Sequence, residues 1–204
     1  MTKEKFLEII TYIGNVIRHS HFENHVYAVG GSVRDFVMGN EIKDIDLVID
    51  LPEGGIKFAE WIKDNQGLSS SVVVYPTYGT AMFHFYKYPE YEIECVMTRG
   101  EEYRDSKSRN PQVVYVPIEE DCIRRDLSIN ALYMNVSTKE IVDIIGGQED
   151  IKNKVLRTTN PNPNVVFIDD PLRILRVVRF KSRYPDFNID PLTFASMFEN
   201  VDRL

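Results

Sequence analysis

The chain has few cysteines and no long apolar run. Only Cys95 and Cys122 occur among its 204 residues, and they do not form a Cys-x-x-Cys pair. This scarcity fits the reducing cytoplasm and argues against structural zinc. No apolar stretch approaches the roughly 20 residues that a membrane helix needs. The first ten residues alternate charged with apolar side chains and contain no small-residue cleavage site, so we expect no signal peptide and no membrane partner.

The chain also lacks the basic excess that is typical of proteins with a large nucleic-acid-binding surface. Its formal net charge is −7. Residues 1–98 carry 8 Lys and Arg against 14 Asp and Glu, whereas residues 99–204 carry 16 against 17. An acidic first half is expected where carboxylates hold cations, and any contact with RNA must be local. The composition, 43% hydrophobic and 27% charged, is that of an ordinary globular protein.

Periodic patterns predict a small α/β domain with a mixed sheet, followed by helices from about residue 169. Helical spacing of apolar residues predicts helices over residues 4–18, 32–40, 56–66, 146–156, 169–184 and 187–204. Alternating or β-branched runs predict strands over residues 25–31, 44–50, 71–86 (with a turn at 77–80) and 91–97. Residues 121–136 predict a helix that leads into a strand. The polar residues 99–112 are interpreted as a mobile loop.

Three carboxylates in two predicted strands suggest a metal site. Asp44 and Asp46 lie two residues apart, so their side chains leave the same sheet face with Cα atoms about 6.6 Å apart. Such a pair can hold Mg²⁺ together with substrate phosphates, and a cation relieves the repulsion between the two charges. Glu94 could face the same cation or accept a proton from an attacking hydroxyl. The alternative is a solvated edge strand, with Glu94 pointing outward like Glu92.

A glycine corner precedes the aspartates. Gly30 and Gly31 end a predicted strand and open a predicted helix, so their N–H groups can approach phosphate oxygens. Arg34 in the first helical turn can add a charge-assisted contact. Ser32 is the expected N-cap, and Gly39 lies near the end of the helix. The spacing matches neither the Rossmann nor the Walker pattern, and an ordinary tight turn is the alternative.

These residues form a longer pattern. The segment GGSVRDFVMGNEIKDIDLVI resembles the first signature of class II tRNA nucleotidyltransferases and bacterial poly(A) polymerases. Three further segments resemble motifs of that family in the same order. They are RRDLSINAL (124–132), DIIGGQEDIKNKVLR (143–157) and DDPLRILRVVRF (169–180). The likeness covers nearly the whole chain from Tyr27 onward.

The resemblance implies a nucleotidyltransferase head of the DNA polymerase beta-like type over residues 1–158. Residues 159–204 would begin a helical neck, and the family's body and tail domains would be absent. The implied reaction adds C or A from CTP or ATP to the 3′ end of tRNA by phosphoryl transfer. Two Mg²⁺ ions would be held by Asp44 and Asp46, where they would activate the RNA 3′-hydroxyl and neutralise the departing pyrophosphate, and Glu94 would assist. Nothing in the sequence indicates the oligomeric state.

In the family, side chains of the last motif recognise the base of the incoming nucleotide. The resemblance implies that Asp170 and Arg173 have this role here. A carboxylate accepts from the exocyclic amine of cytosine or adenine, and a guanidinium donates to the adjacent ring acceptor. Uracil presents a carbonyl where the carboxylate needs a donor, so it is rejected. Here Asp169 replaces the usual glutamate of the family, which keeps the charge but shortens its reach.

The same motif places Arg176 and Arg179 at three-residue steps along the predicted helix, where they would extend a nucleotide-binding face. The alternative is a solvated basic helix face. The opposite, packed arc is predicted to contain Leu172, Ile174, Leu175 and Val178.

In the second motif, Arg125 matches a nucleotide-contacting arginine of the family. Asp126 and Asn130 would orient the ribose or brace the site. The alternative is that these residues cap a helix–strand corner.

Two other functions remain open. Poly(A) polymerases of this family tend to carry a Gly-Arg/Lys-Arg-Phe segment, whereas this chain has Tyr78-Gly79-Thr80, which is similar to the Phe-Gly-Thr of the tRNA enzymes. The sequence therefore favours CCA addition over poly(A) synthesis. In the family a flexible element helps the switch from C to A, and residues 99–112 would serve this role. A nucleotide- or RNA-binding module without turnover is the third possibility.

Overall fold

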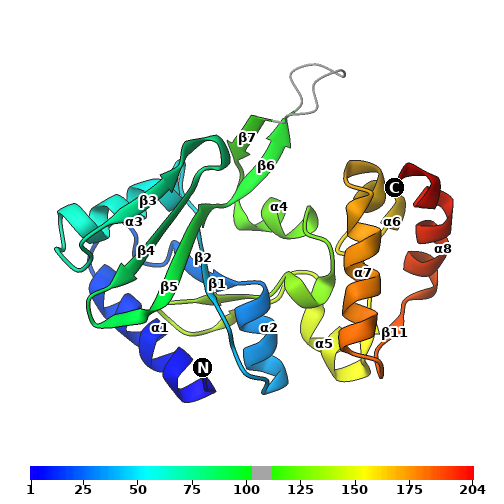
Figure 1. The fold of residues 1–204 in the computed structure, drawn as a ribbon, viewed down its shortest axis with the longest axis horizontal. Helices are drawn as coiled ribbons and strands as arrows, with labels where there is room; N and C mark the ends of the chain where they lie inside the picture. The colour runs from blue at the N-terminus through cyan, green and yellow to red at the C-terminus, as the bar shows by residue number, and fades with distance from the viewer. Residues whose placement is uncertain (103–111) are drawn as a thin grey trace. The chain divides into compact units, whose positions relative to one another are not determined.

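The computed structural model describes residues 1–102 and 112–204, which divide into two compact units (Figure 1). The first unit comprises Met1–Asp121 and Tyr133–Val142, and the second comprises Cys122–Leu132 and Asp143–Leu204. The chain therefore enters the second unit, returns to the first for a short stretch, and leaves it again.

A mixed sheet forms the frame of the first unit, as predicted, and it has seven strands (Figure 1). The strand order is β3-β4-β5-β2-β1-β8-β9. Only β2 and β5 pair in parallel, and the other neighbours are antiparallel. The strands are β1 (Val26–Val29), β2 (Ile45–Ile49), β3 (Val72–Tyr75), β4 (Thr80–Phe85), β5 (Tyr88–Met97), β8 (Tyr133–Asn135) and β9 (Ile141–Val142). A 3₁₀ turn, Pro76–Tyr78, connects β3 to β4.

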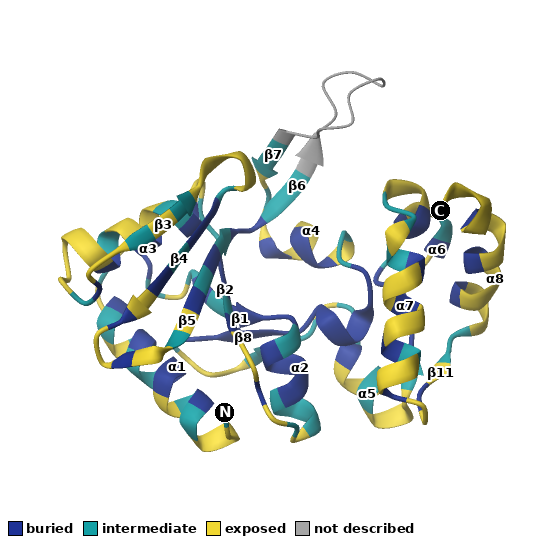
Figure 2. Cartoon of the chain, viewed as in Figure 1, coloured by how far each residue is buried: buried dark blue, intermediate teal, exposed yellow. Residues whose placement is uncertain are grey.

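Three helices of this unit confirm the periodic patterns: α1 (Lys3–Ile17), α2 (Gly31–Met38) and α3 (Gly54–Asp64). The rings of Phe22 and Phe58 lie edge to face, and Phe58 contacts Phe83 of β4. Tyr12 of α1 lies edge-on to Phe85 in the same strand. Helices α1 and α3 therefore bury one face of the sheet, and Figure 2 shows buried residues along its strands.

The strand register separates apolar from carboxylate side chains. Ile45 and Leu47 of β2 pair with Ile93 and Cys95 of β5, and all four are fully or almost fully buried. Asp46, between them, points to the opposite face because successive side chains of a strand alternate. The face away from α1 and α3 therefore carries the acids.

Helix α1 approaches the chain after β8 at Gly14, where an added Cβ would overlap the carbonyl oxygen of Val136. We expect Gly14→Ala to lower the free energy of unfolding by about 1–3 kcal/mol, because overpacking outweighs the gain in helix propensity. Urea unfolding would measure the change. The control Asn15→Ala lies on the exposed side of the same helix and should shift stability by less than about 0.5 kcal/mol. Equal stability of Gly14→Ala and wild type would contradict the close approach.

The prediction of a loop over residues 99–112 is wrong at both ends of the range, where the structure has strands. Strand β6 (Arg99–Glu102) pairs antiparallel with β7 (Gln112–Tyr115), and residues 103–111 lie outside the described part of the chain. Charged and polar residues did not indicate these strands, because the pairing of the two backbones with each other supplies the hydrogen bonds.

Two predicted helix boundaries need correction. Ser32 is not an N-cap: α2 begins at Gly31, and the Ser32 hydroxyl instead donates to the carbonyl of Val29 at 3.0 Å. The helix predicted within residues 121–136 is α4 (Ile118–Ile123), which ends early. A 3₁₀ turn, Ser128–Asn130, precedes β8. Gly39 does end α2, in a left-handed conformation.

The second unit is mainly helical. Its elements are α5 (Gly147–Asn153), β10 (Val155–Leu156), α6 (Pro163–Asp169), α7 (Leu172–Arg183), β11 (Asn188–Ile189), α8 (Pro191–Asn200) and a 3₁₀ turn, Val201–Arg203. Strands β10 and β11 pair in parallel. The short helix predicted within 146–156 is confirmed. No helix in the described residues is long and apolar enough to cross a membrane.

The predicted helix over 169–184 is divided in the structure. Asp169 ends α6, and Asp170 is extended at φ −147°, ψ 102° before α7 begins at Leu172. A residue that precedes proline avoids the helical region, so Pro171 separates the two helices. The predicted packed arc is also partly wrong. Ile174, Val177 and Phe180 are the buried residues, whereas Leu172, Leu175 and Val178 are exposed.

Candidate active site

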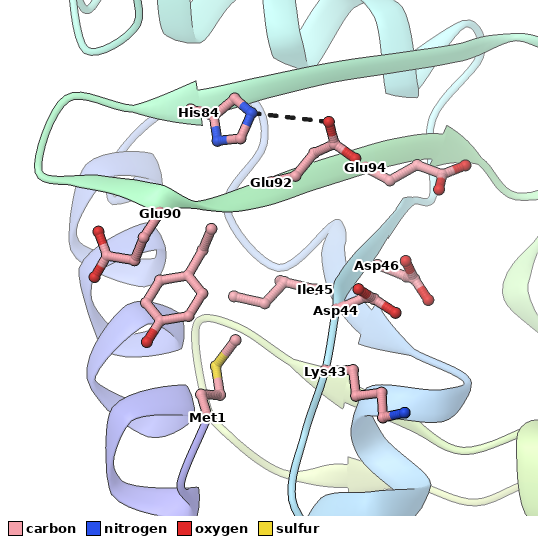
Figure 3. Close-up of a pocket in the computed structure, with 10 residues that line it drawn as sticks. Met1, Lys43, Asp44, Ile45, Asp46, His84, Glu90, Glu92 and Glu94 are labelled. Carbon is pink, nitrogen blue, oxygen red and sulfur yellow. Dashed lines mark ion pairs between the residues drawn. The ribbon is translucent and has the colours of Figure 1, made fainter.

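The three predicted carboxylates come together on the sheet face opposite α1 and α3. Asp46 of β2 is the direct register partner of Glu94 in β5. Asp44 immediately precedes β2 instead of lying within it. Figure 3 shows the side chains of Asp44 and Asp46 side by side, with that of Glu94 on the neighbouring strand. The parallel pairing of β2 with β5 therefore brings together acids that are about fifty residues apart in sequence.

These acids line a cavity of about 530 Å³ that we call the carboxylate cavity (Figure 3). His84 and Glu92 also line it and form an ion pair at 3.8 Å when the histidine is protonated. The full lining is Met1, Lys43, Asp44, Ile45, Asp46, His84, Glu90, Tyr91, Glu92 and Glu94. Five carboxylates against two basic side chains make this cavity strongly negative and suited to cations.

A nearby thiol responds to this negative charge. The pKa of Cys95 is raised well above its ordinary value, first by complete burial and then by the charges of Glu94 and Asp46.

Within the described ranges, no three His, Cys, Asp or Glu side chains are grouped so as to hold a metal ion. The carboxylate oxygens suit a hard cation such as Mg²⁺, whose remaining ligands would be water and phosphate oxygens.

The glycine corner lies at the start of α2, in the same unit. Gly30 is the N-cap and has φ 69°, a conformation that favours glycine. A Cβ on Gly31 would lie 3.6 Å from the guanidinium of Arg34, so a cation lies beside the helix N-terminus. Arg34 is buried and makes bidentate contacts of 3.0 and 2.9 Å with Asp35. Asp35 was not predicted as a site residue, although its place next to Arg34 in the first motif was the available signal.

In the second unit, Asp126 is the centre of a buried network. Its carboxylate accepts hydrogen bonds from Asn130 Nδ2 at 3.1 Å and Arg176 Nε at 2.6 Å. It also accepts one from the backbone N–H of Leu127 at 2.8 Å. Burial raises the pKa of Asp126, but the charge of Arg176 and these hydrogen bonds outweigh it, so the pKa lies below the ordinary 3.8. The contacts brace the motif that contains Asp126, and Arg176 points to that carboxylate.

Because Arg176 forms an ion pair with Asp126, we expect the free energy of unfolding to depend on pH. Replacing Arg176 by alanine should lower the free energy of unfolding by about 1–3 kcal/mol at pH 7, because it leaves a buried carboxylate without its cation. The lower part of this range applies because Arg176 is half exposed and screened by solvent. Since the folded-state pKa of Asp126 is depressed, the pair stabilises above pH 3.8 and loses its effect as the pH falls through the folded-state pKa.

Urea unfolding at pH 7 and pH 3 would measure this difference between wild type and Arg176→Ala. Arg179→Ala, an exposed arginine three residues along the same helix, is the control and should change stability little at either pH. The same loss for Arg176→Ala at both pH values would argue against the electrostatic origin.

The motif over residues 143–157 has a structural role in the same unit. The Asp143 carboxylate accepts hydrogen bonds from the N–H groups of Gly146 and Gly147 at 2.9 and 2.8 Å, at the start of α5. A Cβ on Gly147 would overlap the carbonyl oxygen of Ser128. The paired glycines therefore let this motif pack directly on the motif over residues 124–132.

The two predicted base-reading residues lie close together. Asp170 Oδ2 is 3.9 Å from Arg173 Nε, and Asp170 Oδ1 accepts from the N–H of Leu172 at 3.0 Å. Asp170 thus lies between α6 and α7, whose N-cap is Pro171, and is not a helical residue, which corrects the predicted helical placement. Arg173 is largely buried and also donates to the carbonyl of Val166 at 3.4 Å. Arg179 is exposed, and its guanidinium lies 5.7 Å from the ring centroid of Phe180.

Arg125 is half-buried in the turn after α4. Its backbone N–H donates to the carbonyl of Cys122 at 3.3 Å, and its own carbonyl accepts from the hydroxyl of Thr159 at 2.5 Å. These contacts fix the backbone of the motif. The predicted nucleotide contact of Arg125 stays a prediction.

Comparisons with known proteins agree with the motifs. The model of the family described as "Poly A polymerase head domain" matches residues 26–157. The A-adding tRNA nucleotidyltransferase of Aquifex aeolicus is 36% identical over 160 residues, which are 77% of this chain and 18% of that protein. The CCA-adding enzyme of Staphylococcus saprophyticus is 32% identical over 181 residues, which are 89% of this chain and 42% of that protein. The chain thus spans less than half the length of these relatives.

Solved structures give the same result. An apo CCA-adding enzyme superposes with a TM-score of 0.81 at 30% identity, and the match covers 98% of this chain and 45% of that one. Complexes of a CCA-adding enzyme with ATP and with CTP match with TM-scores of 0.76 and 0.74, at 28% and 29% identity, over 98% of this chain and 43% of theirs. The chain therefore belongs to the poly A polymerase head domain family, in which its relatives include tRNA nucleotidyltransferases that add A or CCA.

Proposed function

We propose that this chain is the catalytic part of a template-independent nucleotidyltransferase that adds C and A from CTP and ATP to the 3′ end of tRNA. The observation that carries this proposal is the register pairing of Asp46 with Glu94 beside Asp44. Relatives named A-adding and CCA-adding enzymes, and matching structures with bound ATP and CTP, support the choice of substrates.

The chemistry is transfer of a nucleotidyl group. The RNA 3′-hydroxyl oxygen bonds to the α-phosphorus of the nucleotide while the bond to pyrophosphate breaks, and the hydroxyl proton passes to a base. Nucleotidyltransferases of this family generally use divalent metal ions, and Mg²⁺ bound here would lower the hydroxyl pKa and neutralise the phosphates. Asp44 and Asp46 would hold the ion. Glu94 is the group that would accept the proton or orient the hydroxyl.

The glycine corner would bind the triphosphate. The N–H groups at the start of α2 attract anions, and Gly31 allows close approach because it has no side chain. Arg34 adds a positive charge next to Gly31, and Asp35 holds its guanidinium in place. The carboxylates and the glycine corner belong to one compact unit, so one rigid frame positions both.

The second unit would supply base recognition. Asp170 and Arg173 are adjacent and present an acceptor beside donors, which complements the amine and ring nitrogen of cytosine and adenine. Arg125 and Arg179 remain candidates for contacts with the nucleotide. Asn130 and Arg176 would brace the second unit through their hydrogen bonds to Asp126.

The wider assignments follow from the family. We assign residues 1–158 to the head and 159–204 to the beginning of the neck, and we place the protein in the cytoplasm. Poly(A) synthesis stays a second candidate, because the matching family model describes the head domain of poly A polymerases. A binding module without turnover is the third.

Incorporation of labelled nucleotide by the intact protein tests these alternatives. CTP and ATP should be incorporated into tRNAs that lack CCA, CA or A, whereas mature tRNA and oligo(A) should remain unextended. Extension of oligo(A) would instead favour poly(A) synthesis. Binding of CTP and ATP without any incorporation would favour the module.

A further inference from the structure

Glu94 borders a second hollow besides the carboxylate cavity. This hollow has a volume of about 310 Å³, and we call it the tyrosine hollow. Its lining residues are Tyr75, Tyr78, Thr80, Met82, Glu94, Val96 and Arg99. Met82 is the register partner of Glu94, and Thr80 is that of Val96, so the hollow continues the sheet face that carries the carboxylates. Because Glu94 lines both spaces, a ligand in the tyrosine hollow would end at the candidate catalytic acid.

The two hollows differ in charge. Five carboxylates line the carboxylate cavity, whereas Glu94 and Arg99 are the charged residues that line the tyrosine hollow. A polyanion in the carboxylate cavity would meet Asp44, Asp46, Glu90 and Glu92 as well as Glu94. Approach through the tyrosine hollow instead meets the Arg99 guanidinium. Electrostatics therefore favour the second path for a nucleic-acid strand.

The tyrosine hollow also offers surfaces for stacking. Tyr78 is 63% exposed and Tyr75 is 45% exposed, although both belong to ordered elements at the edge of the sheet. Exposed aromatic rings beside a cation are the usual means by which proteins hold single-stranded nucleic acid without reading its sequence. The Arg99 guanidinium donates to the backbone carbonyl of Tyr78 at 3.3 Å, and both residues line the hollow.

A buried acid anchors Arg99. The carboxylate of Asp121 is fully buried and accepts from the Arg99 N–H at 3.0 Å and from the Tyr133 hydroxyl at 2.7 Å. Through these two hydrogen bonds, Asp121 connects Arg99 at the start of β6 to Tyr133 in the seven-stranded sheet. Asp121 was not predicted as a site residue, and no sequence signal pointed to it. The backbone of Arg99 is thus held by a buried acid.

We propose that the tyrosine hollow binds the single-stranded 3′ end of the RNA that is extended. A terminal base would stack on Tyr78, Arg99 would contact the adjoining phosphate, and the 3′-hydroxyl would face Glu94. The inference rests on the proposed function, because it assigns a position to the RNA substrate of that reaction. It concerns residues that none of the four sequence motifs includes.

The test uses the intact protein with Tyr78→Ala, Arg99→Ala and the conservative Tyr78→Phe. Fluorescence anisotropy would report the binding of a 5′-labelled single-stranded RNA that ends in C-C, and steady-state kinetics would give the KM for RNA and for ATP. Loss of one stacked base weakens binding by about tenfold or more. We expect this loss, with a matching rise in the RNA KM, for Tyr78→Ala and Arg99→Ala. Tyr78→Phe should bind like wild type, and the KM for ATP should stay within about twofold.

Tyr86→Ala is the matched control, because Tyr86 is 62% exposed but lies outside the hollow. Wild-type RNA affinity in Tyr78→Ala, or an equal loss in Tyr86→Ala, would overturn the inference. Absence of incorporation by wild type would reject the proposed function, and the binding measurements would still show whether RNA occupies the hollow. Equal thermal unfolding of all variants would exclude misfolding as the cause.

Discussion

Replacing Asp46 by asparagine is expected to lower nucleotide incorporation by about 1,000-fold or more while leaving the fold intact. The substitution keeps the size of the side chain but removes one of the two charges that would hold the divalent cation. Interactions that stabilise charge developing in a transition state are among the largest catalytic contributions. Single-turnover incorporation of labelled CTP at saturating Mg²⁺ would measure the loss.

Stability supplies an independent readout for this variant. Asp44 and Asp46 repel each other without a cation, so Asp46→Asn should unfold at the same or a slightly higher temperature in metal-free buffer. Glu92→Gln is the matched control, because Glu92 lines the same cavity from β5 but is exposed and faces His84. It should retain activity within a few-fold. An Asp46→Asn protein that incorporates nucleotide at the wild-type rate would refute the metal assignment.

The second large effect is expected from Arg173→Ala, which should reduce the preference for CTP over UTP. A site that hydrogen-bonds a base edge discriminates strongly, because the wrong base leaves a buried polar group without a partner. Removing the guanidinium deletes the donor and also releases Asp170, which lies 3.9 Å from it. We expect the ratio of kcat/KM for CTP to that for UTP to fall by about 100-fold.

Arg183→Ala controls for the loss of a positive charge on the same helix. Arg183 is exposed in the last turn of α7, where it lies over the ring of Tyr184, and its replacement should leave base selection unchanged. Discrimination against UTP that survives in Arg173→Ala would remove this residue from the base-reading role. A parallel drop in the rates with CTP, ATP and UTP would point to a structural role.

Local sequence patterns predicted much of the fold. Helix α1 and strand β2 each carry an unbroken apolar period, and their burial follows directly from that spacing. Gly39 was predicted near the end of α2 because few other residues adopt the left-handed conformation that is found there. The glycine corner, the aspartate pair and the later arginines were identified because short spacings on one element are visible in the sequence.

Other features depended on contacts between different elements. The strands β6 and β7 have no apolar period, and they form because the two backbones pair with each other. On α7, the sequence offers several apolar arcs, and packing selected the one that contains Ile174, Val177 and Phe180. Similarly, the tyrosine hollow joins residues from β3, β4, β5 and β6, which no linear motif connects.

The amino-acid order alone was enough to propose a reaction class, because its four motifs resemble those of a known family at short, characteristic spacings. It could not place Glu94 beside Asp46, since the parallel pairing of β2 with β5 depends on the whole seven-stranded sheet. Nor could it show that Arg176 pairs with Asp126 across fifty residues. Charge positions within an element follow from backbone geometry, whereas charge positions between elements follow from how the apolar faces pack.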